Sequence, residues 1–198
     1  MPTLWVGLGN PGPEHARNRH NIGFMAIERI AARHGFAPWR SRFRGLFAEG
    51  TMAARKVLAL EPQTYMNASG ESVRAAMAFY KLPLEHVVVF HDELDLPPGR
   101  VRVKKGGGNA GHNGLRSITQ VCGGAEFWRV RLGIGHPGQK EKVVGHVLGN
   151  FHTSDMLWLE PLLDRLAEAA PLLAEGRIEP FLNAVNAAAE RPARAPSA

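Results

Sequence analysis

Two short, continuously apolar runs most constrain the fold of this chain. Residues 4–8 form a run bounded by glycine, and residues 87–90 consist of three valines and a phenylalanine. Runs of this length that end in turn residues are typical of buried strands. We therefore expect residues 4–8 to form a buried strand and residues 87–90 to form a central one.

Predicted strands and helices alternate along the first two-thirds of the chain. Further strands are predicted at residues 43–49, 56–60, 100–105 and 127–134, with a turn near Gly50 between the first two. Helices are predicted at residues 21–35, 69–80 and 115–121. This alternation favours an α/β layered domain.

The last third of the chain is predicted to be helical. Its expected elements are a short apolar piece at 143–148, a long helical region begun by Ser154 and interrupted at Pro161 and Pro171, and a helix at 178–189. At 198 residues the chain suits one domain. We expect that domain at residues 1–189, with C-terminal helices at 154–189 that could form a lid and a disordered tail at 190–198.

The composition limits the cellular compartment and the kind of binding partner that can be expected. A net charge of +6 suggests an anionic partner but does not choose between RNA, DNA and phosphorylated metabolites. The single cysteine, Cys122, excludes an intrachain disulfide and fits a reducing, cytoplasmic setting. No apolar run approaches the roughly 20 residues that span a bilayer, and no signal peptide is expected.

Polar residues follow three of the predicted strands. Asn10 follows the first strand, residues 65–67 follow the third, and Asp92 follows the central one. Sites in open α/β sheets gather at the carboxyl ends of the strands. His20 lies at a loop–helix junction, and a carboxylate such as Asp92 could hold it as a general base. A structural histidine and a turn aspartate are the alternatives.

The glycines near the N-terminus match a dinucleotide-binding fingerprint in spacing alone. Gly7, Gly9 and Gly12 have the required spacing, but prolines flank the third glycine at positions 11 and 13. In the fingerprint that glycine belongs to the start of a helix that points at pyrophosphate. Nucleotide binding of this kind is therefore rejected.

Covalent and metal-dependent chemistry are both disfavoured. Cys122 has no histidine near it in sequence, and the chain has no GxSxG motif. Residues 91–95 hold four side chains that can ligate metals, but consecutive residues point in different directions and no HExxH motif exists. Hydrolysis, if it occurs, would use water activated by a base.

A glycine-rich segment at residues 106–114 could receive a phosphate. Glycines expose backbone N–H groups, and a helix begins after them. Arg102 and Lys104 lead into the segment, and Arg131 lies on a neighbouring predicted strand. A flexible loop with solvated basic residues is the alternative.

Seven motifs in one order resemble the bacterial peptidyl-tRNA hydrolases, over nearly the whole chain to about residue 189. They are VGLGNPG at 6–12, RHNIG at 19–23, TYMNASG at 64–70, HDELDLPPG at 91–99, GGGNAGHNGLRSI at 106–118, RVRLGIGHPG at 129–138 and VVGHVLGNF at 143–151. The resemblance implies a single α/β domain with a twisted mixed sheet surrounded by helices. It also implies cleavage of the ester between a peptide and the 3′ end of its tRNA, by a cytoplasmic monomer without metal or cofactor.

The resemblance assigns roles residue by residue. His20 would activate water, Asp92 would hold it in its basic form, and Asn10 would bind near the ester. The residues that would bind substrate or tRNA are His15, Tyr65, Met66, Asn67, His112, Asn113, Arg102, Lys104 and Arg131.

Two positions depart from the family pattern, and one alternative function stays open. His15 stands where the family usually has tyrosine, and Asn109 stands where many members have histidine. Plastid RNA-splicing factors share this fold and act as RNA binders. The presence of Asn10, His20 and Asp92 together favours a catalyst over such a binding module.

Overall fold

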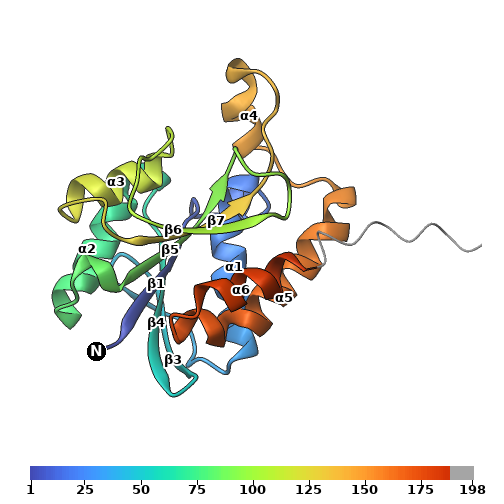
Figure 1. The fold of residues 1–198 in the computed structure, drawn as a ribbon. Coiled ribbons are helices and arrows are strands. Elements are labelled where there is room, and N and C mark those ends of the chain that lie inside the picture. Colours follow the sequence, from blue (N-terminus) through green and yellow to red (C-terminus); the bar gives the residue numbers. More distant parts are fainter. Residues whose placement is uncertain (188–198) are drawn as a thin grey trace, which may run out of the picture.

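The computed structural model of the protein describes residues 1–187 and contains a seven-stranded sheet between two layers of helices (Figure 1). The strand order is β2-β3-β4-β1-β5-β7-β6. The strands are β1 (Thr3–Gly7), β2 (Arg40–Arg42), β3 (Gly45–Met52), β4 (Arg55–Pro62), β5 (Val87–Glu93), β6 (Val101–Lys105) and β7 (Trp128–Gly133). The predicted tail and the predicted last residues of the final helix lie outside the described residues.

The sheet is mixed, with parallel strands at its centre. β1 is parallel to both β4 and β5, and β5 is parallel to β7. The outer pairs β2–β3, β3–β4 and β6–β7 are antiparallel. The expectation of a twisted mixed sheet in an α/β domain is therefore confirmed.

Helices cover both faces of the sheet (Figure 1). The helices are α1 (Ile22–Arg33), α2 (Ser69–Tyr80), α3 (Asn113–Val121), α4 (Val143–Val147), α5 (Met156–Ala174) and α6 (Ile178–Asn186). The helices α1, α5 and α6 enclose one core, and α2 and α3 enclose the other. In β5, Val88 and Phe90 belong to the first core while Val87 and Val89 belong to the second. This double burial explains why the strand is apolar at every position rather than at alternate ones.

Two strand boundaries differ from the sequence prediction. The hairpin between β3 and β4 turns at Ala53 and Ala54, which both have positive φ angles, and not near Gly50. Gly50 instead lies inside β3 against the Phe36 ring, where a Cβ atom would come within 2.1 Å of a ring carbon. The central strand β5 also runs three residues further than predicted, through His91, Asp92 and Glu93.

The long helix α5 also differs from its prediction. It is continuous through Pro161 and Pro171, whereas interruptions were expected there. It begins at Met156, and the backbone N–H of His152 donates to the Asp155 carboxylate, so Ser154 is not the cap. A proline inside a helix costs about 3 kcal/mol. Several buried leucines of α5 each contribute about 1.5–3 kcal/mol, so packing holds the helix together.

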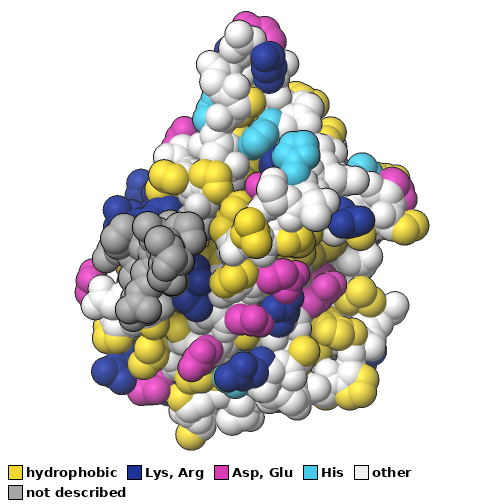
Figure 2. Space-filling view, turned by 90° about the vertical axis from the view of Figure 1, so that its right-hand side faces the viewer, with side chains coloured by type: hydrophobic (Ala, Val, Ile, Leu, Met, Phe, Trp, Pro, Cys, Tyr) yellow, Lys and Arg dark blue, Asp and Glu magenta, His cyan; other side chains and the backbone are white. Residues whose placement is uncertain are grey.

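The face that carries α5 has charges of both signs. Figure 2 shows acidic and basic side chains intermingled over its lower half, with histidines toward the narrow upper end. Arg29 of α1 pairs with Glu160 and Asp164 of α5. No helix among residues 1–187 has the length and apolarity to cross a bilayer.

Candidate active site

The site begins where β5 extends beyond its neighbour β1. Pairing between the two strands ends at Gly7 and Phe90, and the next residues of β5 pair only with β7. His91, Asp92 and Glu93 are nevertheless buried, with exposed fractions of 2%, 4% and 8%. Buried polar groups require partners. The partners come from segments far away in the chain.

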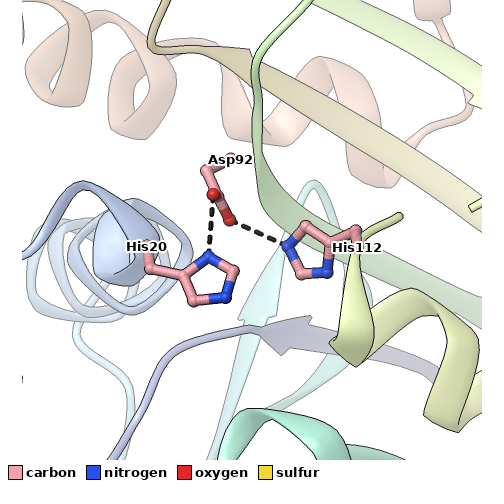
Figure 3. Close-up of side chains that lie close together, drawn as sticks. All are labelled: His20, Asp92 and His112. Atoms are coloured by element: carbon pink, nitrogen blue, oxygen red, sulfur yellow. Dashed lines mark hydrogen bonds and ion pairs between the residues drawn. The ribbon is translucent and has the colours of Figure 1, made fainter. Parts of the chain in front are cut away.

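Asp92 lies between two histidines (Figure 3). His20 precedes α1, and its Nδ1 is 2.8 Å from Asp92 Oδ2. His112 precedes α3, and its Nε2 is 2.8 Å from Asp92 Oδ1. The expected contact between His20 and Asp92 is present, and His112 adds a second one.

The hydrogen bonds define which nitrogen of each ring carries a proton. The Asp92 carboxylate accepts only, so His20 Nδ1 and His112 Nε2 must both donate. His112 Nδ1 accepts from the backbone N–H groups of Gly114 and Leu115, at 3.1 and 3.3 Å, which caps α3. Both nitrogens of His112 are therefore engaged. The Nε2 of His20 has no such backbone partner among the described residues.

The electrostatics support an ionised Asp92. Burial alone would raise the pKa of Asp92, but the two histidines outweigh burial and hold it well below its usual range. For His20, burial lowers the pKa. The charge of Asp92 and its hydrogen bond outweigh this effect, so the pKa of His20 is raised above 6.5. His20 is thus a stronger base than a free imidazole.

His91 is a buried histidine of a different kind. Its Nδ1 lies 2.8 Å from the Asp92 carbonyl oxygen, so Nδ1 donates. Its Nε2 is buried without a hydrogen-bond partner among the described residues. Burial, with the nearby His112, lowers the pKa of His91 to about 4, which keeps the ring neutral.

Asn10 is held rigidly by hydrogen bonds, but it lines a different and smaller cavity from the one that holds His20, Asp92 and His112. Its backbone N–H donates to Asn21 Oδ1 at 3.0 Å, and the Asn21 amide nitrogen donates back to the Asn10 carbonyl at 2.9 Å. Asn10 Oδ1 accepts from the Met66 N–H at 2.7 Å. The oxygen end of the Asn10 amide is thereby fixed, and its NH₂ group is the end left to meet a ligand.

A cavity of about 820 Å³ opens from the histidine–aspartate cluster. Asn113 and Lys104 line it together with His20, Asp92 and His112. The apolar residues Val143, Val144 and Val147 of α4 line its other side. A cavity that combines an apolar wall with a few converging polar groups is typical of a ligand site.

The predicted basic residues divide into two groups. Arg131 lines the cavity with Lys104, and its Nε donates to Glu93 Oε1 at 2.8 Å. Arg102 is exposed and lies opposite Arg131 in the antiparallel pair of β6 and β7. The three side chains share one face of these strands, although Arg102 does not line the cavity.

The other predicted substrate residues do not line the cavity, and they differ in exposure. Tyr65 is 65% exposed and Asn67 is exposed, whereas Met66 is buried. His15 is half-buried, and its Nδ1 is 2.9 Å from Asn18 Oδ1. Asn18 in turn donates to Asn150, which ties this segment to the residues after α4.

Three contributors to the site escaped the sequence analysis. Asn21 fixes Asn10, and Glu93 holds Arg131. Arg129 is 2% exposed and donates to the carbonyls of Gly107 and Gly108. It lies two residues before Arg131 on the same strand, so no signal in the sequence separated it from the other basic residues.

The only group of three or more metal-ligating side chains within 4.8 Å of one another, among the described residues, is His20, Asp92 and His112. Binding a metal there would require both donated ring protons to leave. The consecutive residues 91–95, considered above as ligands, do not form such a group.

Comparison with known proteins gives one consistent result. The family model described as peptidyl-tRNA hydrolase matches residues 4–193. The peptidyl-tRNA hydrolase of Granulibacter bethesdensis is 67% identical over 93% of this chain and 96% of its own length. That of Acidiphilium cryptum is 64% identical over 92% of this chain and 95% of its own length. The crystal structure of peptidyl-tRNA hydrolase from Acinetobacter baumannii superimposes with a TM-score of 0.87 at 42% identity, covering 94% of this chain and 95% of that chain.

Proposed function

The chain belongs to the peptidyl-tRNA hydrolase family, and from this premise we propose that His20 activates the water that cleaves the ester of peptidyl-tRNA, without a metal ion. The products are a free peptide and a reusable tRNA. The observation that carries this mechanism is the pairing of His20 Nδ1 with Asp92 Oδ2 at 2.8 Å, which leaves Nε2 as the basic nitrogen. A positioned base of this kind typically contributes about 10²- to 10⁴-fold to a rate.

Asn10 is the proposed donor to the developing oxyanion. Its oxygen is occupied by the Met66 N–H, so the NH₂ group is held in a fixed direction. A preorganised donor aimed at such an oxygen contributes about 10²- to 10³-fold. The half-buried and exposed side chains of His15, Tyr65, Asn67 and Asn113 are proposed to bind the tRNA end and the peptide, with Met66 as an apolar wall.

The tRNA phosphates are proposed to meet the face of β6 and β7 that carries Arg102, Lys104 and Arg131. Glu93 fixes the direction of Arg131, while Lys104 and Arg102 are exposed. Basic side chains that are free to meet phosphate supply most of the non-specific affinity for a nucleic acid.

The proton positions support the proposed water-activating role of His20 without a metal. The cluster nitrogens that face Asp92 both carry protons, so neither offers a lone pair to a cation. Activity should survive exhaustive chelation followed by assay in metal-free buffer. Loss of activity that a single divalent cation restores would contradict this part of the proposal.

The catalytic test uses purified peptidyl-tRNA and mass spectrometry of both products. The wild-type protein should release free peptide and intact tRNA. His20→Ala should abolish release while tRNA binding stays close to wild type, and His86→Ala, which changes a histidine outside the cavity, should keep full activity. Turnover by His20→Ala at the wild-type rate would exclude His20 as the base.

We also propose the cellular setting that the family premise implies. The protein would act as a cytoplasmic monomer in translation, with one catalytic domain at residues 1–189. Light scattering of the purified protein tests the first point, and a stable dimer would contradict it.

A further inference from the structure

A second, smaller cavity is lined by Asn10 and by residues of α1, and it shares no lining residue with the larger cavity. It has a volume of about 180 Å³, enough for several water molecules at about 30 Å³ each. Its polar lining consists of the amides Asn10, Asn21 and Gln63 and the carboxylates Glu28 and Glu61. The side-chain atoms that this lining can offer to a cation are therefore oxygens, because it contains no histidine or cysteine.

Glu61 is the unusual member of this lining. It is 2% exposed, and its Oε1 is buried without a hydrogen-bond partner. Neither Glu61 nor Glu28 forms an ion pair with any described lysine, arginine or histidine. The neighbouring side chain that acts on Glu61 is Glu28 of α1, a second carboxyl that lines the same cavity. A buried carboxyl without a counter-ion is costly.

Such a pair needs either a shared proton or a cation between its members. Burial, and then the Glu28 carboxylate, raise the pKa of Glu61 to about 10, so an empty site keeps a proton on the pair at neutral pH. A cation would displace that proton and be bound by both carboxylates. The cavity beside the two carboxyl groups favours the cation, because a pair that only shares a proton needs no space next to it.

We propose that this cavity binds a divalent metal cation such as Mg²⁺, through the carboxylates of Glu28 and Glu61 and through water. Mg²⁺ is typically bound by one or two carboxylates and keeps several waters, which matches two carboxyl groups beside a water-sized cavity. An oxygen-only donor set also suits Mg²⁺ or Ca²⁺ better than zinc or copper. The cation would tie α1 to the end of β4 and stabilise the fold without taking part in the reaction.

The test is thermal unfolding of the full-length, RNA-free protein with MgCl₂ or CaCl₂ at constant ionic strength. A cation at about 100 times its Kd should raise the melting temperature by roughly 5 °C or more. The rise should saturate with concentration in the wild type and be lost in Glu61→Gln. Glu175→Gln, the same change at an exposed position, should keep the full rise.

A second variant keeps the test decisive if the buried position tolerates no change. Glu28 is exposed, so Glu28→Gln should fold, and it should also lose the rise. A wild type without a saturable response to either cation, or the same response in wild type and Glu61→Gln, would overturn the proposal. The first outcome would show that the pair shares a proton only, and the second would show that the cation binds elsewhere.

Discussion

His20 and His112 make the same contact with Asp92, yet only one of them can act as a base. Each ring donates one proton to the carboxylate at 2.8 Å. The second nitrogen of His112 is consumed as the cap of α3, whereas that of His20 is not. The proposed difference in role between the two histidines therefore depends on the backbone around each ring.

This difference predicts the behaviour of His112 variants. His112→Ala should lose about 0.5–2 kcal/mol of stability through the missing helix cap. It should reduce kcat about tenfold, since Asp92 loses one of two donors, and should not abolish activity as His20→Ala does. His112→Asn, whose side chain can cap a helix, should recover most of the stability in a denaturant titration. An alanine variant with wild-type stability would contradict the capping role.

Asn10→Asp isolates the proposed oxyanion donor. The carboxylate can still accept from the Met66 N–H, so the loop should stay in place. The NH₂ group is lost, and kcat should fall about 10²-fold or more with a small change in KM. Steady-state kinetics on peptidyl-tRNA measure both constants. Unchanged kcat would remove Asn10 from the reaction.

The sequence predicted residues at strand ends better than residues that act through others. Asn10 follows a strand, His20 precedes a helix and Asp92 lies near the end of β5, and such positions can be approximated from periodicity. Asn21 and Glu93 act by holding another side chain, so their roles depend on a pairing between distant segments. A single sequence does not contain that pairing.

At the scale of elements, α1 lies unusually close to the sheet. A Cβ atom on Gly23 would come within 2.3 Å of the Phe90 carbonyl oxygen and 2.6 Å of the Leu8 nitrogen. Both are backbone atoms, which cannot yield as a flexible side chain can. This close approach brings His20, three residues earlier, to the end of β5.

Gly23→Ala should therefore destabilise the protein and disturb the site together. Overpacking of this kind costs about 1–3 kcal/mol and occasionally more. The measurement is denaturant unfolding combined with activity, and Gly35→Ala is an imperfect comparison because its φ is positive. Gly145→Ala, where a Cβ would meet nothing within 4 Å, is the matched control. Equal stability of the two variants would contradict the packing argument.

Element boundaries were predicted less well than element types, for reasons visible in the packing. Gly50 was expected to mark a turn but serves as space for the Phe36 ring. The polar end of β5 was expected to be a loop, but pairing with β7 keeps it extended. In both cases a tertiary contact outweighs a local preference.

The whole molecule consists of two cores on either side of one sheet, and the sequence predicted this class. Continuous apolar strands and alternating helices were sufficient evidence for an α/β domain. The strand order was not predictable, because it depends on which strands pair across long connections. The edge pair β6–β7 gathers the basic residues into one surface only through that order.

This basic surface predicts how tRNA binding depends on salt. The affinity should fall as salt rises, and neutralising one phosphate contact should reduce the slope by about 1. Lys104→Gln and Arg102→Gln should each show the shallower slope in binding titrations at several salt concentrations. Arg55→Gln, an exposed change in the β3–β4 hairpin, should keep the wild-type slope. Slopes identical to wild type for Lys104→Gln and Arg102→Gln would place these residues outside the interface.

The pH dependence of kcat, compared between wild type and Asp92→Asn, tests the central claim most directly. In the proposed mechanism the neutral form of His20 is the base, so kcat should rise with pH. Asp92 outweighs the lowering effect of burial, so the wild-type midpoint should lie above 6.5. Without the carboxylate only burial remains, so Asp92→Asn should show a lower midpoint and a kcat reduced by about 10²- to 10⁴-fold. The same midpoint in both proteins would show that the paired imidazole and carboxylate do not form the water-activating centre.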